Sequence, residues 1–172
     1  MPLLAALLSP AAQATEGPAD ARAIEQQYRH GDPAQALQRL NTALAARPGD
    51  AALRFLQGVL LAEGGQSSQA AATFERLTQE FPDLPEPHNN LAVLHAAAGR
   101  LDAARAALET ALQLDPAYRA AHENLGDVYV RLAARAYAAA ADAARPEPAL
   151  QRKLQLARDL ARSLPAAAGQ PR

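Results

Sequence analysis

Four histidines are the residues of this chain with the most obvious capacity for chemistry: His30, His88, His95 and His122. An imidazole can transfer protons near neutral pH or bind a metal. His88 and His95 lie seven residues apart and so share a helix face. No third ligand follows at a spacing typical of a zinc site. We therefore expect a structural role for the histidines, with a small helical metal-binding protein or enzyme as the alternative.

Other catalytic signatures are missing from the sequence. None of the serines stands in a G-x-S-x-G context, and no P-loop lysine follows Gly64-Gly65. The chain has no cysteine, which excludes disulfides and thiol catalysis. Its net charge is −1, from 17 basic and 18 acidic residues, so nucleic-acid binding has little electrostatic support. We predict a protein that is not an enzyme, with no cofactor, no metal and no nucleic-acid partner.

A constant offset of 34 residues organises the elements that carry these side chains. Prolines recur at this offset, and so do glycines, alanines and the large apolar residues that follow the alanines by four positions. The series are Pro48, Pro82, Pro116; Gly31, Gly65, Gly99; Ala36, Ala70, Ala104; Leu40, Phe74, Leu108; and Gly58, Ala92, Gly126. Several series in phase indicate a helical repeat.

The clearest unit reads His88-x₂-Leu91-Ala92-x₂-His95, then Ala104-x₃-Leu108, then Pro116. This resembles the tetratricopeptide repeat (TPR) family, whose pattern is W-x₂-L-G-x₂-Y, A-x₃-F and P. The resemblance covers about Asp32 to Leu132. The chain departs from it at Arg54, His88 and His122, which replace Trp, and at Gln57, which replaces Leu.

The fold class that this resemblance implies is all-α: a right-handed superhelical stack of antiparallel helix pairs, a TPR α-solenoid with a C-terminal capping helix. Small residues at Gly58, Ala92 and Gly126 should lie where paired helices touch. The prolines should stop each second helix. Expected helices cover residues 20–29, 34–46, 51–63, 67–80, a pair within 88–116 that turns at Gly99-Arg100, 118–144 and 149–164. The first of these should be a cap, and Asp32 and Asp50 should be N-caps.

The repeat changes after Pro116. Ala133 stands in phase with Gly65 and Gly99, so the turn signal is missing. We predict one long helix ending before Pro146, with a hairpin broken near Ala133 as the alternative. Residues 149–164 follow as an amphipathic helix, with Leu150, Leu154, Ala157 and Leu160 on one face.

The first residues predict export. An apolar run from Leu3 to Leu8 precedes Ala12-Gln13-Ala14, an A-x-A cleavage signature before Thr15. Residues 1–14 are thus expected to be a signal peptide with a truncated basic region, 19–164 the TPR array and 165–172 a disordered tail. The predicted location is periplasmic or secreted, with a cytoplasmic protein as the alternative. The run is too short to span a bilayer, so no transmembrane segment is expected.

The resemblance also implies a concave groove lined by the first helix of each unit, which binds an extended or helical peptide. The positions carried over by phase are Phe55, Val59, Ala62, Glu86, Asn89, Val93, Ala96, Glu123, Asp127, Val130 and Arg131. They are apolar at one end and acidic at the other, which favours apolar or basic peptides. The predicted function is a protein–protein interaction module, an adaptor or assembly factor in the bacterial envelope. A self-associating structural protein is a further alternative.

Overall fold

The computed structural model describes residues 17–143 and 147–164. The predicted signal peptide (1–14) and tail (165–172) lie outside these ranges. Within them the chain forms eight α-helices and no strand, so the predicted all-α class is confirmed. The helices are α1 (Gly17–Arg29), α2 (Pro33–Ala46), α3 (Ala51–Glu63), α4 (Ser67–Glu80), α5 (Pro85–Ala97), α6 (Leu101–Leu114), α7 (Arg119–Ala143) and α8 (Pro148–Ser163). The chain divides into two compact units between Leu53 and Arg54.

Glycines in phase make the turns between paired helices. Gly65 and Gly99 have φ angles of 75° and 74°, a left-handed conformation that other residues rarely adopt. Around Gly65, the Gln66 amide donates to the Leu61 carbonyl at 2.8 Å and the Gly65 amide donates to Ala62 at 3.1 Å, the pattern of a Schellman motif. These bonds satisfy carbonyls that the end of α3 leaves open.

Ala133, the residue in the same phase, lies inside α7, which runs unbroken for 25 residues. The predicted long helix is therefore confirmed, and the alternative hairpin at Ala133 is wrong. The physical reason is local: alanine is the best helix former and avoids the left-handed conformation that the turn needs.

Aspartates begin two of the helices, as predicted. The Asp32 carboxylate accepts from the Gln35 amide at 2.9 Å, with Pro33 at the first position of α2. The Asp50 carboxylate accepts from the amides of Ala52 and Leu53 at 3.0 and 3.1 Å. Each bond satisfies an amide that has no partner inside its own helix.

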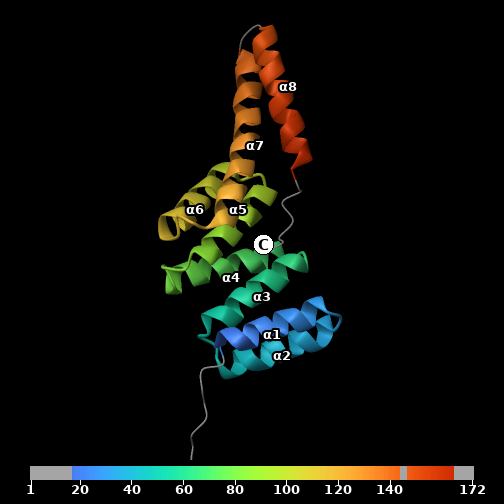
Figure 1. Ribbon diagram of the computed structural model, residues 1–172, viewed down its shortest axis with the longest axis vertical. Coiled ribbons are helices and arrows are strands. Elements are labelled where there is room, and N and C mark those ends of the chain that lie inside the picture. Colours follow the sequence, from blue (N-terminus) through green and yellow to red (C-terminus); the bar gives the residue numbers. More distant parts are fainter. Residues whose placement is uncertain (1–16, 144–146, 165–172) are drawn as a thin grey trace, which may run out of the picture. The chain divides into compact units, whose positions relative to one another are not determined.

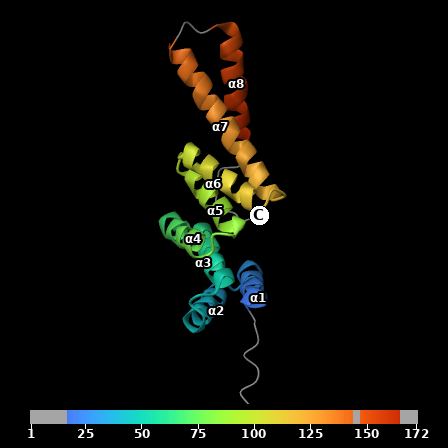
Figure 2. The same ribbon diagram turned by 90° about the vertical axis from the view of Figure 1, so that its left-hand side faces the viewer.

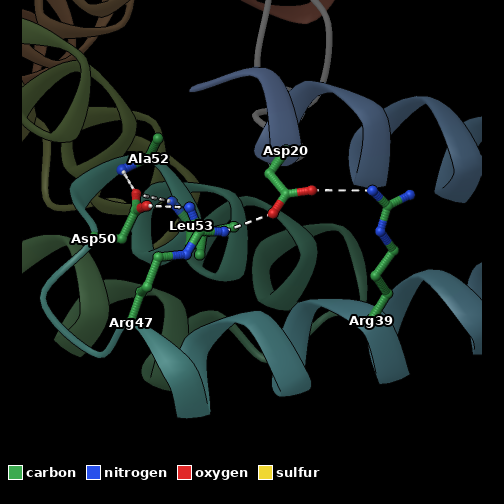
Figure 3. Close-up of polar contacts among 6 residues, drawn as sticks. All are labelled: Asp20, Arg39, Arg47, Asp50, Ala52 and Leu53. Carbon is green, nitrogen blue, oxygen red and sulfur yellow. Dashed lines mark hydrogen bonds and ion pairs between the residues drawn. The ribbon is translucent and has the colours of Figure 1, made fainter. Parts of the chain in front are cut away.

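In the first unit, α1 packs on α2 over an apolar seam. Ile24 and Ala36 are fully buried, and Leu40 is 1% exposed. Beside this seam the Asp20 carboxylate bridges Arg39 at 3.0 Å and Arg47 at 2.6 Å (Figure 3). Arg47 also approaches Asp50 at 3.5 Å, so one set of ion pairs links α1, α2 and the cap of α3.

The second unit packs its helices in chain order. The α5 helix contacts α4, α6 and α7, and α6 contacts α7. Ala92, Ala104, Leu108, Ala111, Ala121 and Val128 form a buried cluster from α5, α6 and α7. The α3–α4 pair is also closely packed, because a Cβ built on Gly58 would lie 2.6 Å from Cε1 of the buried Phe74. The small residues at Gly58 and Ala92 therefore lie in packed seams, as predicted.

The α7 helix continues past α5 and α6, and α8 returns antiparallel beside it (Figures 1 and 2). Among the described helices α8 contacts α7 alone, and none of its residues is buried. Since α8 has 16 residues and α7 has 25, α8 ends before it reaches the first turns of α7.

Gly126 does not follow the prediction made for it. It is exposed, and no atom lies within 4 Å of a Cβ built there, whereas Gly58 and Ala92 are buried. The reason is that α7 never turns back, so no second helix covers this level. The last repeat has a first helix without its usual partner.

Candidate functional site

The groove predicted in this chain depends on the first helices of the repeats, and the second unit holds two of them whole, α5 and α7. A side-chain hydrogen bond joins these two: the Asn124 amide donates to Oδ1 of Asn89 at 2.8 Å. Asn89 is only 4% exposed, and burying its amide without such a partner would cost about 1–3 kcal/mol. The pair therefore links α5 to α7 through a part-buried polar contact.

The predicted groove residues fall into two groups by burial. Val59 and Asn89 are buried, and Ala96 packs against the buried cluster between α5, α6 and α7. The others are exposed or half-buried: Phe55, Ala62, Glu86, Val93, Glu123, Asp127, Val130 and Arg131. These exposed and half-buried residues are the accessible part of the predicted site. Val59, Asn89 and Ala96 pack in the interior behind them.

Phe55 has a packing role besides. Its ring lies 5.6 Å from the ring of Phe74, centre to centre, at 54°. Such tilted pairs add about 0.5–1.5 kcal/mol beyond the area they bury. Val59 is 3% exposed, so a charged residue placed there would destabilise the core. A loss of peptide binding in such a variant would not by itself identify a groove residue.

Three carboxylates and two cations, Arg119 and Arg131, lie on the accessible surface of α5 and the start of α7. Glu86 and Glu123 are exposed, Asp127 is half-buried, and Arg131 is the one cation among the groove candidates. Burial raises the pKa of Tyr118, and the nearby carboxylates of Glu86 and Asp115 raise it further. The Tyr118 phenol is therefore a neutral donor beside these carboxylates at physiological pH.

Three of the four histidines are engaged in packing or local hydrogen bonds, and His30 is exposed. Nδ1 of His95 accepts from Nε of Arg100 at 3.1 Å, and Nε2 of His122 lies 2.9 Å from the Pro116 carbonyl. Burial lowers the pKa of His88 and of His95, and Arg100 lowers that of His95 further. In residues 17–143 and 147–164 no three metal-ligating side chains come together.

Arg54 has a role that reasoning from the sequence missed. It replaces the tryptophan of the repeat pattern, yet its guanidinium makes two hydrogen bonds to the Glu80 carboxylate at the end of α4. Its side chain is 13% exposed, and the hydrogen bond lowers the pKa of Glu80. Arg54 and Glu80 are 26 residues apart, at the start and the end of one helix pair. This spacing is compatible with an ion pair, but it does not single out Glu80 among the other acidic residues.

A packed series of helical hairpins with an exposed first-helix face defines an α-helical repeat protein. Comparison with protein families agrees: residues 22–85 match the model described as tetratricopeptide repeat, and residues 94–132 match the model described as TPR repeat. Together the matches cover more than half of the chain, and the chain belongs to the tetratricopeptide repeat family. Its repeats make it a protein–protein interaction module.

None of the helices in the described part of the chain is long and apolar enough to cross a membrane.

Proposed function

We propose that this chain is a non-enzymatic adaptor that holds a basic peptide segment, extended or helical, on the accessible faces of α5 and α7. The observation that carries the proposal is the Asn89–Asn124 hydrogen bond, which joins the two helices at 2.8 Å. Glu86 precedes Asn89 by one helical turn, and Glu123 directly precedes Asn124. The bond therefore sets two exposed carboxylates on adjoining helices.

The chemistry of this surface favours a particular kind of peptide. Half-buried Val93 offers apolar contact, while Glu86 and Glu123 offer negative charge. Exposed carboxylates attract lysine and arginine through interactions that salt screens over about 8–10 Å. We expect binding of peptides that alternate basic and apolar residues, with affinity that falls as salt rises.

A selected peptide tests this surface directly. A peptide library displayed on phage would yield a binder, whose affinity is then measured by fluorescence anisotropy. The variant Glu86→Gln/Glu123→Gln should bind about tenfold more weakly, equivalent to about 1.4 kcal/mol, with a smaller salt dependence. Glu109→Gln is the matched control, because Glu109 is exposed on α6. Equal losses in the variant and the control would contradict the proposal.

The proposed setting is the bacterial envelope, reached by export. Support comes from the apolar run Leu3–Leu8 and the Ala12-Gln13-Ala14 signature alone. Mass spectrometry of the protein purified from fractionated cells tests it: the exported form should begin at Thr15. A protein that keeps its first fourteen residues in the cytoplasmic fraction would overturn export while leaving the peptide site intact.

A further inference from the structure

The α7–α8 hairpin carries the most exposed large apolar side chains in the described part of the chain. Leu156 is 70% exposed, Leu160 51% and Tyr129 48%. Leu156 and Leu160 lie one turn apart on α8, and Tyr129 lies one turn beyond the open position at Gly126 on α7. Exposed apolar side chains that form one contiguous patch are typical of a surface that a partner covers.

These side chains lie on one side of the hairpin. Half-buried Val130, Ala134 and Tyr137 have the spacing of one stripe on α7, and half-buried Leu150, Leu154 and Ala157 have that of one stripe on α8. Because α7 and α8 are in contact, we infer that these two stripes face each other. Tyr129 comes one residue before Val130 on α7, and Leu156 comes one residue before Ala157 on α8. One residue corresponds to a rotation of about 100° around the helix axis, so each exposed stripe lies about 100° from the half-buried stripe of its helix. Because the helices are antiparallel, these two displacements point to the same side.

Gly126 supplies a vacant position on this side. In the second repeat the equivalent Gly58 accepts the ring of Phe74, which comes from the helix paired with it. At Gly126 nothing lies within 4 Å of the position that a Cβ would take, since the last repeat has no such helix. The backbone at Gly126 is therefore open to a side chain from another molecule, and Leu156 and Leu160 of α8 are exposed.

We propose that a second copy of this chain completes the repeat. Leu156 of each copy packs on Gly126 of the other, and Leu160 packs against Tyr129. A two-fold axis makes both contacts twice, because each copy carries both Gly126 and Leu156. The helix spacing agrees: Lys153 and Leu156 lie three residues apart, as do Glu123 and Gly126.

Charge agrees with this register. Lys153 is exposed on the side of α8 that bears Leu156, near the tip of the hairpin, and Glu123 is exposed near its base. An antiparallel two-fold arrangement that sets Leu156 over Gly126 brings each Lys153 to the Glu123 carboxylate of the second copy, where a basic peptide would have to displace it. Opposite charges at the edge of an apolar contact fix its register and orientation.

Sedimentation equilibrium on the full chain tests the pairing. The unaltered protein should have the mass of two chains, and Leu156→Glu/Leu160→Glu should associate at least about a hundredfold more weakly, since about 2.7 kcal/mol of apolar contact is lost. Leu114→Glu is the control, because Leu114 is an exposed leucine on α6 and its loss should leave the dimer intact. Far-UV circular dichroism checks that each variant stays helical. A single-chain mass for the unaltered protein, or a dimer that survives the double substitution, would overturn the proposal.

Cross-linking tests the register, and the chain contains no cysteine to confuse it. Copies with Gly126→Cys are mixed with differently tagged copies that carry Leu156→Cys, and the mixture is oxidised. A disulfide joining the two tags should form readily, and at least about tenfold more slowly when Leu114→Cys replaces Leu156→Cys. Equal rates would overturn this arrangement. So would a monomer whose Leu156 face becomes protected only when a different protein is added.

Discussion

At the residue scale, the repeat depends on small and large side chains meeting in pairs. Phe74 is fully buried, packs against the tilted ring of Phe55 and lies against the backbone at Gly58. Arg54 shows that a polar residue can serve at a position where the family pattern has an aromatic one, because its guanidinium finds a carboxylate at the end of the next helix.

Phe74→Ala should lower the free energy of unfolding by about 3–5 kcal/mol, as expected for a buried aromatic truncation. Chemical denaturation followed by circular dichroism measures it. Leu114→Ala, at an exposed leucine on α6, should change stability by only about 0.5 kcal/mol. A small effect at Phe74 would mean that this seam does not support the second unit.

Protonation of His88 should destabilise the fold. Burial lowers its pKa in the folded chain below the ordinary value of 6.5, so the unfolded chain binds the proton more tightly. Stability contributed by the neutral imidazole is full above the unfolded pKa and is lost as pH falls through the folded pKa. We expect the denaturant concentration at the unfolding midpoint to decrease as the pH is lowered from about 7.5 to about 5.5. In His88→Gln this decrease should be smaller. A midpoint with the same pH dependence in both proteins would contradict this assignment.

At the element scale, α7 determines how the array ends. It begins as the first helix of a repeat and continues through Ala133, where the earlier units turn. One consequence is that glycines at equivalent positions have opposite surroundings. Gly58 lies against the Phe74 ring, and Gly126 lies in open space.

Alanine substitutions at these two glycines should therefore have opposite signs. Gly58→Ala places a Cβ 2.6 Å from Cε1 of Phe74 and should destabilise by about 1–3 kcal/mol, because the ring is fully buried. Gly126→Ala should stabilise by about 0.4–1 kcal/mol, since alanine restricts the unfolded chain and meets nothing. Both are measured by urea denaturation in the Leu156→Glu/Leu160→Glu background, which removes any contribution from association. Two losses of similar size would show that Gly126 is packed in solution.

At the scale of the whole molecule, stability should be uneven along the chain. The α5 helix contacts three neighbours and buries six residues, whereas α8 contacts only α7 among the described helices and buries none. Repeat proteins are stabilised mainly by contacts between neighbouring units, so an element with one neighbour opens first.

Native-state hydrogen exchange followed by mass spectrometry measures this gradient. In the Leu156→Glu/Leu160→Glu protein, amides of α8 should exchange at least about tenfold faster than those of α5, because opening α8 uncovers little apolar area. Leu114→Glu serves as the control for added charge. Uniform protection from α5 to α8 would contradict the gradient.

The sequence by itself determined the helices and their periods. Turn glycines, cap aspartates and prolines act within a few residues of themselves, so Gly65, Gly99, Asp32 and Asp50 could be interpreted without any tertiary contact. The long α7 followed from the same local logic, because Ala133 supplies no turn.

Burial was decided by the tertiary structure. Phase placed Val59, Asn89 and Gly126 correctly on their helices, but which neighbour covers each side depends on helices far away in the sequence. Val59 and Asn89 are buried, while Gly126 is open because α7 does not fold back. Likewise Arg54 and Asn124 found Glu80 and Asn89 only through packing, since a hydrogen bond between helices needs a geometry that residue spacing does not specify.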